Sequence, residues 1–164
     1  MLRNKKIVFT AHCVLNQNSV IKDWERSASS FKTIIDLITK EDISIIQLPC
    51  PELKHLGLNR PPLSKEDYDN LEYRQLCSQL SENIVEEVLV YKKENYRIIG
   101  LIGIEESPTC DTNGRKGIFM EELFKELSNK DLELRTFDIP EKFSENDKFS
   151  LENEFVNFLK GYSK

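Results

Sequence analysis

The strongest constraint on the fold is a regular alternation of short apolar runs with helical patterns. The apolar runs predict strands at 5–12, 43–48, 96–104 and 132–139, and the intervening periodicities predict helices at 24–41, 65–93, 117–127 and 145–161. Near-continuous apolar strands that alternate with helices are typical of a parallel sheet covered on both faces. The 164 residues therefore predict one α/β domain spanning 1–164, Rossmann-like or flavodoxin-like, with a mainly parallel sheet of four strands and helices on both faces.

A cysteine follows each of the first three predicted strands. Cys13, Cys50 and Cys110 stand just beyond the runs that end near residues 12, 48 and 104. The functional crevice of an open α/β sheet lies outside the carboxyl ends of its strands. If the strand order begins 2-1-3, as in flavodoxin-like sheets, the three strands are neighbours about 4.8 Å apart and the thiols can meet within roughly 10 Å. The pattern predicts a shared site.

Converging thiols are compatible with several chemistries, and the residues alone leave them open. Thiolates are the usual ligands of iron–sulfur clusters. The same three could hold zinc, with water or His12 as the remaining ligand. A single cysteine could instead be a nucleophile activated by His12 or His55, although His12 and Cys13 adjoin on a predicted extended segment, where neighbouring side chains diverge. The fourth interpretation is that all three are ordinary buried residues.

Charge and composition exclude two broad classes. The formal net charge is -5 and the basic residues are scattered, which disfavours a nucleic-acid binder. No apolar run is long enough to cross a bilayer, and the amino terminus lacks a secretory pattern, so we expect a cytoplasmic protein. The four cysteines include no Cys-x-x-Cys pair, and in a reducing cytosol they are expected to be free thiols. The sequence carries no signal for an oligomeric state.

Three motifs around the cysteines resemble one known family. They are "CVLNQN", "PCPEL" followed by Gly-Leu and Arg-Pro-Pro, and "ESPTC". In this order, spread over residues 6–127, they are similar to the thiouracil desulfidase family, and the chain looks like a divergent, desulfidase-related branch of it. Asn16 stands where the family has glycine, and Thr109 and Asp111 replace a serine and a glycine.

The resemblance implies a [4Fe-4S] cluster held by Cys13, Cys50 and Cys110, with one iron left open. That iron would accept sulfur from a small thiolated substrate such as a thiouracil, which would leave as the carbonyl compound. A Rossmann-like fold is implied as well. The rival function is a non-catalytic iron–sulfur or zinc protein that serves as a sensor, sulfur carrier or assembly partner.

Two side chains near the cysteines are the candidate catalytic residues. Glu52 follows Cys50 by two positions and could activate water or deliver a proton; its alternative is a salt bridge with Lys54 or Arg60. Ser107 could hydrogen-bond the cluster or the substrate, or could simply build a Ser-Pro turn.

Other polar residues are weaker candidates. Glu105 and Glu106 are alternative acids or bases, Trp24 could line a pocket, and the loop 111–117 with its arginine could hold an anion or be a solvated turn. Cys77 lies on the apolar face of a predicted helix, which favours a core position over a fourth ligand.

Overall fold

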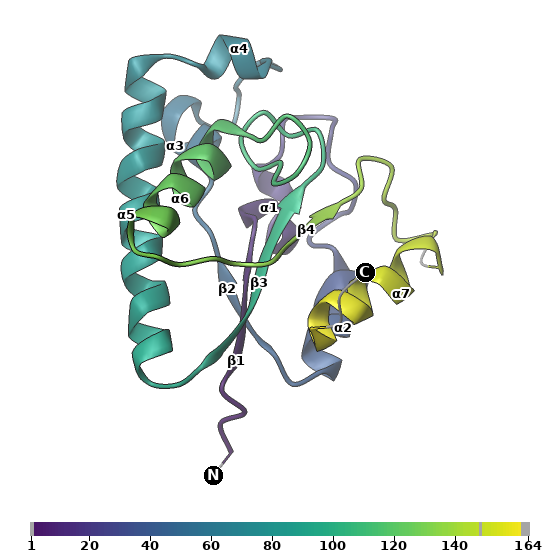
Figure 1. Ribbon diagram of the computed structural model, residues 1–164. Coiled ribbons are helices and arrows are strands. Elements are labelled where there is room, and N and C mark those ends of the chain that lie inside the picture. The colour runs from purple at the N-terminus through teal and green to yellow at the C-terminus, as the bar shows by residue number, and fades with distance from the viewer. Residues whose placement is uncertain (1, 148, 162–164) are drawn as a thin grey trace.

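A single parallel sheet of four strands organises the chain. The computed structural model describes residues 2–147 and 149–161. The sheet order is β2-β1-β3-β4 and every pairing is parallel (Figure 1). The strands are β1 (Lys6–Thr10), β2 (Ser44–Gln47), β3 (Arg97–Ile104) and β4 (Thr136–Ile139). The α/β class and the 2-1-3 order of the first three strands are confirmed, and all four carboxyl ends lie at one edge.

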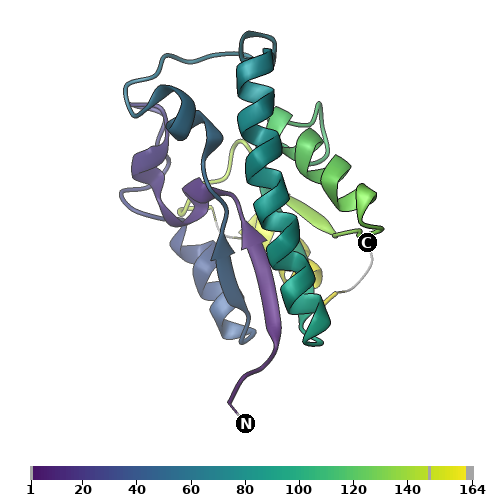
Figure 2. The same cartoon turned by 90° about the vertical axis from the view of Figure 1, so that its left-hand side faces the viewer.

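Helices cover both faces of the sheet (Figures 1 and 2). One face packs against α2 (Lys32–Lys40) and α7 (Phe149–Lys160), and the other packs against α5 (Leu71–Lys93) and α6 (Ile118–Asn129). Each face has its own buried cluster, because strands buried on both sides point alternate apolar residues into two layers. Although α5 has 23 residues, neither it nor any other helix of the described chain is apolar enough to cross a bilayer.

The predicted helix over 24–41 begins only at Lys32. Serines explain the difference, since the Ser27 hydroxyl donates to the Ser30 carbonyl and accepts from the Ser29 amide. Side chains that bond nearby backbone groups compete with helical hydrogen bonds. The Phe31 amide also donates to the Val14 carbonyl at 2.9 Å. Residues 24–31 are therefore held by these side-chain bonds and by the segment that follows β1, and not by helical hydrogen bonds.

The predicted helix over 65–93 is divided into α4 (Lys65–Tyr68) and α5. The Asn70 side chain accepts from the Tyr73 amide at 3.0 Å and so caps the start of α5. The helix predicted over 145–161 is observed over 149–160, with position 148 outside the described residues. The last strand begins at Thr136 and not at residue 132.

Three short helical elements at the carboxyl edge of the sheet are absent from the sequence prediction. They are α1 (His12–Leu15), η1 (Gln17–Ser19) and α3 (Pro51–Leu56). β1 ends at Thr10, so the extended conformation predicted for residue 12 is wrong. These elements matter because α1 contains Cys13 and α3 begins directly after Cys50.

Candidate functional site

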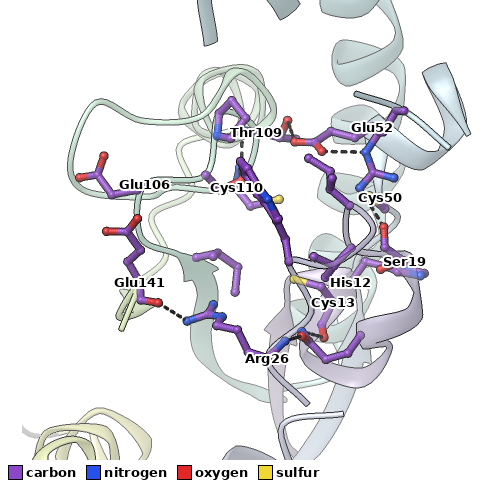
Figure 3. A pocket seen from close by; sticks show the side chains of 18 of the residues that line it. His12, Cys13, Ser19, Arg26, Cys50, Glu52, Glu106, Thr109, Cys110 and Glu141 are labelled. Carbon is purple, nitrogen blue, oxygen red and sulfur yellow. Dashed lines mark hydrogen bonds and ion pairs between the residues drawn. The ribbon is translucent and has the colours of Figure 1, made fainter. Parts of the chain in front are cut away.

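A cavity of about 350 Å³ opens at the carboxyl edge of the sheet. All five predicted site residues line it: Cys13, Cys50, Glu52, Ser107 and Cys110. Figure 3 shows the three cysteines, contributed by three different segments of the chain, around this space. The structure therefore brings together the residues that follow β1, β2 and β3, as the strand order predicts.

Two of the weaker candidates do not reach the cavity. Cys77 is fully buried in the cluster beneath α5 and α6, as expected for a core residue. His55 packs its ring against Tyr73 at 5.1 Å between centroids and does not line the cavity. By contrast, Trp24 lines the cavity while 60% exposed.

Cys50 is the residue that precedes a helix. Pro51 occupies the first position of α3, where its missing amide proton and fixed φ are tolerated. The Cys50 sulfur accepts a hydrogen bond from the Leu53 amide at 3.4 Å. A helix cap therefore restricts the Cys50 side chain, and the sequence signal for α3 is the proline at its first turn.

Cys110 is held by a tight loop after β3. The Ser107 hydroxyl oxygen accepts hydrogen bonds from the amides of Thr109 at 3.3 Å and Cys110 at 3.0 Å. Ser107 therefore has the turn-building role that was its alternative interpretation. Its own proton goes to no acceptor within the described residues, so it remains available to a ligand in the cavity.

Two glycines allow this loop to pack closely. A Cβ at Gly103 would lie 2.4 Å from the Cys110 carbonyl oxygen, and a Cβ at Gly117 would lie 2.0 Å from the Thr109 carbonyl carbon. No side chain fits at either distance. The absent side chains let the Cys110 loop pack between β3 and the start of α6.

Cys13 is the second residue of α1, and its neighbour His12 is bonded elsewhere. His12 Nδ1 lies 3.0 Å from the Leu48 carbonyl oxygen. Because a carbonyl only accepts, Nδ1 must carry the proton in this contact. The imidazole therefore fastens the end of β1 to the end of β2, and this contact does not support its pairing with Cys13.

The three thiols strongly resist ionisation in this environment. Burial, followed by the charge of Cys50, raises the pKa of the Cys13 thiol to about 12. Burial also raises the pKa of Cys50, and it raises that of Cys110 well above its ordinary value, with repulsion from Cys13 and Cys50 adding to the effect. Three thiolates in this cavity therefore require a nearby positive charge, such as a cationic metal group.

No single metal ion fits the side chains as they stand. Within residues 2–147 and 149–161, no three His, Cys, Asp or Glu side chains are grouped closely enough to hold one ion. Thiolates on one tetrahedral zinc would lie only about 3.8 Å apart, given zinc–sulfur bonds of about 2.3 Å. Zinc on these three cysteines would therefore require their side chains to rearrange.

Glu52 is the centre of a buried polar network. Arg60 Nε donates to Glu52 Oε2 at 3.1 Å, which is the salt bridge considered from the sequence. The Thr109 hydroxyl donates to Glu52 Oε1 at 2.8 Å. Because that proton is used, the Tyr73 hydroxyl 2.7 Å away must donate to Thr109. Sequence reasoning missed Thr109 and Tyr73, since nothing in their spacing links them to Glu52.

Thr109→Val tests this network. Valine keeps the shape but leaves the Tyr73 hydroxyl and one Glu52 oxygen unsatisfied in a buried site. We expect the free energy of unfolding to fall by about 1–3 kcal/mol. Thr109→Ser keeps the hydroxyl and should lose less than about 1 kcal/mol. Urea denaturation of both variants measures the difference, and equal losses would contradict the hydrogen-bond chain.

Comparison with known proteins identifies two matches. The profile of the family described as "Putative 2-thiouracil desulfurase" matches residues 5–122. An uncharacterized protein of Methanocaldococcus jannaschii is 43% identical over 148 residues, which cover 90% of this chain and 94% of that protein. No solved structure matches the chain. The matched region includes all three cysteines and Glu52.

Proposed function

We propose, from the premise that this chain belongs to the 2-thiouracil desulfurase family, that it replaces the sulfur of a small thiolated heterocycle with oxygen. The reaction balances as a hydrolysis: water supplies the oxygen that bonds to carbon, the carbon–sulfur bond breaks, and sulfur leaves as hydrogen sulfide. No net oxidation or reduction is required. The carrying observation is that three cysteines from three strand ends line one cavity together with Glu52.

The donor set fits the [4Fe-4S] cluster that the family resemblance implies. Cys13, Cys50 and Cys110 would hold it, and three thiolate ligands leave one iron without a protein ligand. A cluster binds each thiolate through a different iron, so it suits thiols that surround a space without meeting at one point. When bound, the cluster would supply an open, soft iron as the sulfur acceptor.

Glu52 is suited to act as a base. Arg60 and Thr109 both donate to its carboxylate. Each bond uses a different oxygen, which fixes the plane of the carboxylate beside the cavity. We propose that Glu52 removes a proton from the attacking water and passes it to the departing sulfur. The Ser107 hydroxyl, with its free proton, would orient the substrate by donating to one of its polar atoms.

Anaerobic reconstitution with iron and sulfide followed by an assay with 2-thiouracil tests the function. We expect a brown protein that converts 2-thiouracil to uracil with one equivalent of sulfide released. Metal analysis separates iron from zinc. An iron-loaded protein that leaves 2-thiouracil and related thiolated bases unchanged would favour the sensor or carrier function. Zinc without iron would contradict the cluster.

A further inference from the structure

Arg26 places a fixed positive charge at the cavity. Its guanidinium is partly buried, and Nη1 donates to the carbonyl oxygen of Pro140 at 2.7 Å. Nη1 also donates to the carbonyl oxygen of Glu141 at 2.8 Å (Figure 3). The same group lies 5.0 Å from the ring centroid of Phe31. Two carbonyls and an aromatic face thus hold the side chain in one pose.

The charge of Arg26 is not neutralised by an ion pair. Among residues 2–147 and 149–161, no carboxylate lies within 4.0 Å of a nitrogen of its guanidinium, whereas Arg60, the other arginine of the cavity, is paired with Glu52. Burial lowers the pKa of Arg26, as expected for a cation that is partly removed from water. It nevertheless remains charged at neutral pH, because arginine does not deprotonate in proteins.

The carboxylates that line the cavity do not cancel the charge of Arg26. Arg26 lines the same cavity as Cys13, so its charge faces the space that the three cysteines surround. Glu105, Glu106 and Glu141 also line the cavity, but all three are exposed, and water and salt screen exposed carboxylates more than they screen a partly buried cation.

The lining of the cavity favours a soft, weakly hydrated anion. Most of it is apolar, including Val20, Ile21, Trp24, Leu63 and Ile104. A guanidinium is itself weakly hydrated, so it pairs more readily than an ammonium with anions that lose their water easily. Sulfur anions have this character and match the chemistry proposed for the site.

We propose that Arg26 forms a binding site for anionic sulfur within the cavity. The ligand is either the thiolate form of a thiolated heterocycle or the hydrosulfide released from it, two sources of the same chemistry. This inference rests on the proposed function for its choice of ligand. The site itself needs no cluster and is present in the metal-free protein.

Trp24 provides a direct readout of this site. It is the only tryptophan of the chain and lines the same cavity. The metal-free protein is titrated anaerobically with thiocyanate, a stable soft anion, and with neutral thiourea, while tryptophan fluorescence is recorded. We expect a saturable change with thiocyanate and at most a linear, collisional change with thiourea. A linear response of the wild type to both would overturn the proposal.

Substitutions of Arg26 test whether its side chain binds thiocyanate. We expect Arg26→Gln to weaken thiocyanate binding at least about tenfold, and Arg26→Lys to weaken it less than Arg26→Gln does, because lysine keeps the charge but is more strongly hydrated than a guanidinium. Arg115→Gln is the matched control, since Arg115 pairs with Glu66 outside the cavity; it should bind as wild type does. Binding that is unchanged in a folded Arg26→Gln protein would contradict the assignment.

Two further titrations identify the source of the anion and separate this proposal from the desulfidase function. Hydrosulfide that competes with thiocyanate supports a product site, and 2-thiouracil that competes better as pH rises supports a substrate site. Competition by neither would overturn the choice of sulfur as ligand. An inactive reconstituted enzyme with intact, Arg26-dependent thiocyanate binding would contradict the desulfidase function alone. A wild-type protein that is active after reconstitution but does not bind thiocyanate would contradict the anion site alone.

Discussion

Replacing Cys13, Cys50 or Cys110 with alanine will abolish the visible absorption that the wild-type protein gains on anaerobic reconstitution. Each variant removes one of the three proposed ligands, and the cavity offers no fourth cysteine to replace it, since Cys77 lies in the core. We expect about four irons per wild-type chain, as a [4Fe-4S] cluster requires, and less than about a tenth of that in each variant. Iron analysis and absorption spectra measure both.

Cys77→Ala is the matched control for these variants. It removes a thiol from the hydrophobic core beneath α5 and should leave the iron content unchanged. Its expected cost is stability alone, because it leaves a small void in the core. Retained absorption in all three cavity variants would contradict the cluster. Loss of absorption in folded Cys77→Ala would mean a fourth ligand and would contradict the open iron.

Glu52→Gln will lower the kcat for 2-thiouracil by about 10²- to 10⁴-fold while the iron content stays at the wild-type level. Glutamine has nearly the same shape and can still accept a hydrogen bond from Thr109 through its oxygen, but its amide nitrogen then faces Arg60 and the ion pair is lost, so kcat is compared on protein shown to be folded. It cannot accept the proton of the attacking water. The loss should therefore appear in kcat and not in cluster binding.

Glu105→Gln provides the comparison within the same cavity. Glu105 is exposed, and its carboxylate accepts from the Glu141 amide at 2.8 Å, a bond that glutamine can keep. We expect its kcat to stay within about threefold of wild type. Equal activity of Glu52→Gln and wild type would remove Glu52 from the mechanism. A large loss in Glu105→Gln alone would move the base to that position.

The local sequence pattern is sufficient to predict the sheet, but it does not predict the conformation of the segments beside the cavity. The apolar runs of β1 and β3 are recognisable because central strands buried on both faces have little other choice of residue. Residues 24–31 read as a helix but are not one, because serine hydroxyls and bonds to the chain near Val14 replace the helical ladder. The periodicity shows which residues are apolar. It does not show which polar side chains will form hydrogen bonds with backbone groups in place of the helical ones.

The sequence by itself determined the α/β class. It also placed the three cysteines and Glu52 at one edge of the sheet, because strand ends in a parallel sheet must share an edge. Only the tertiary structure decided how that edge is built. Thr109 and Tyr73 join Glu52 across 57 and 21 positions of chain, and Arg26 is anchored 114 residues away at Pro140. Such contacts form only when loops from different strands pack together, so no local spacing encodes them. The cavity and the position of Arg26 at its wall depend on that packing.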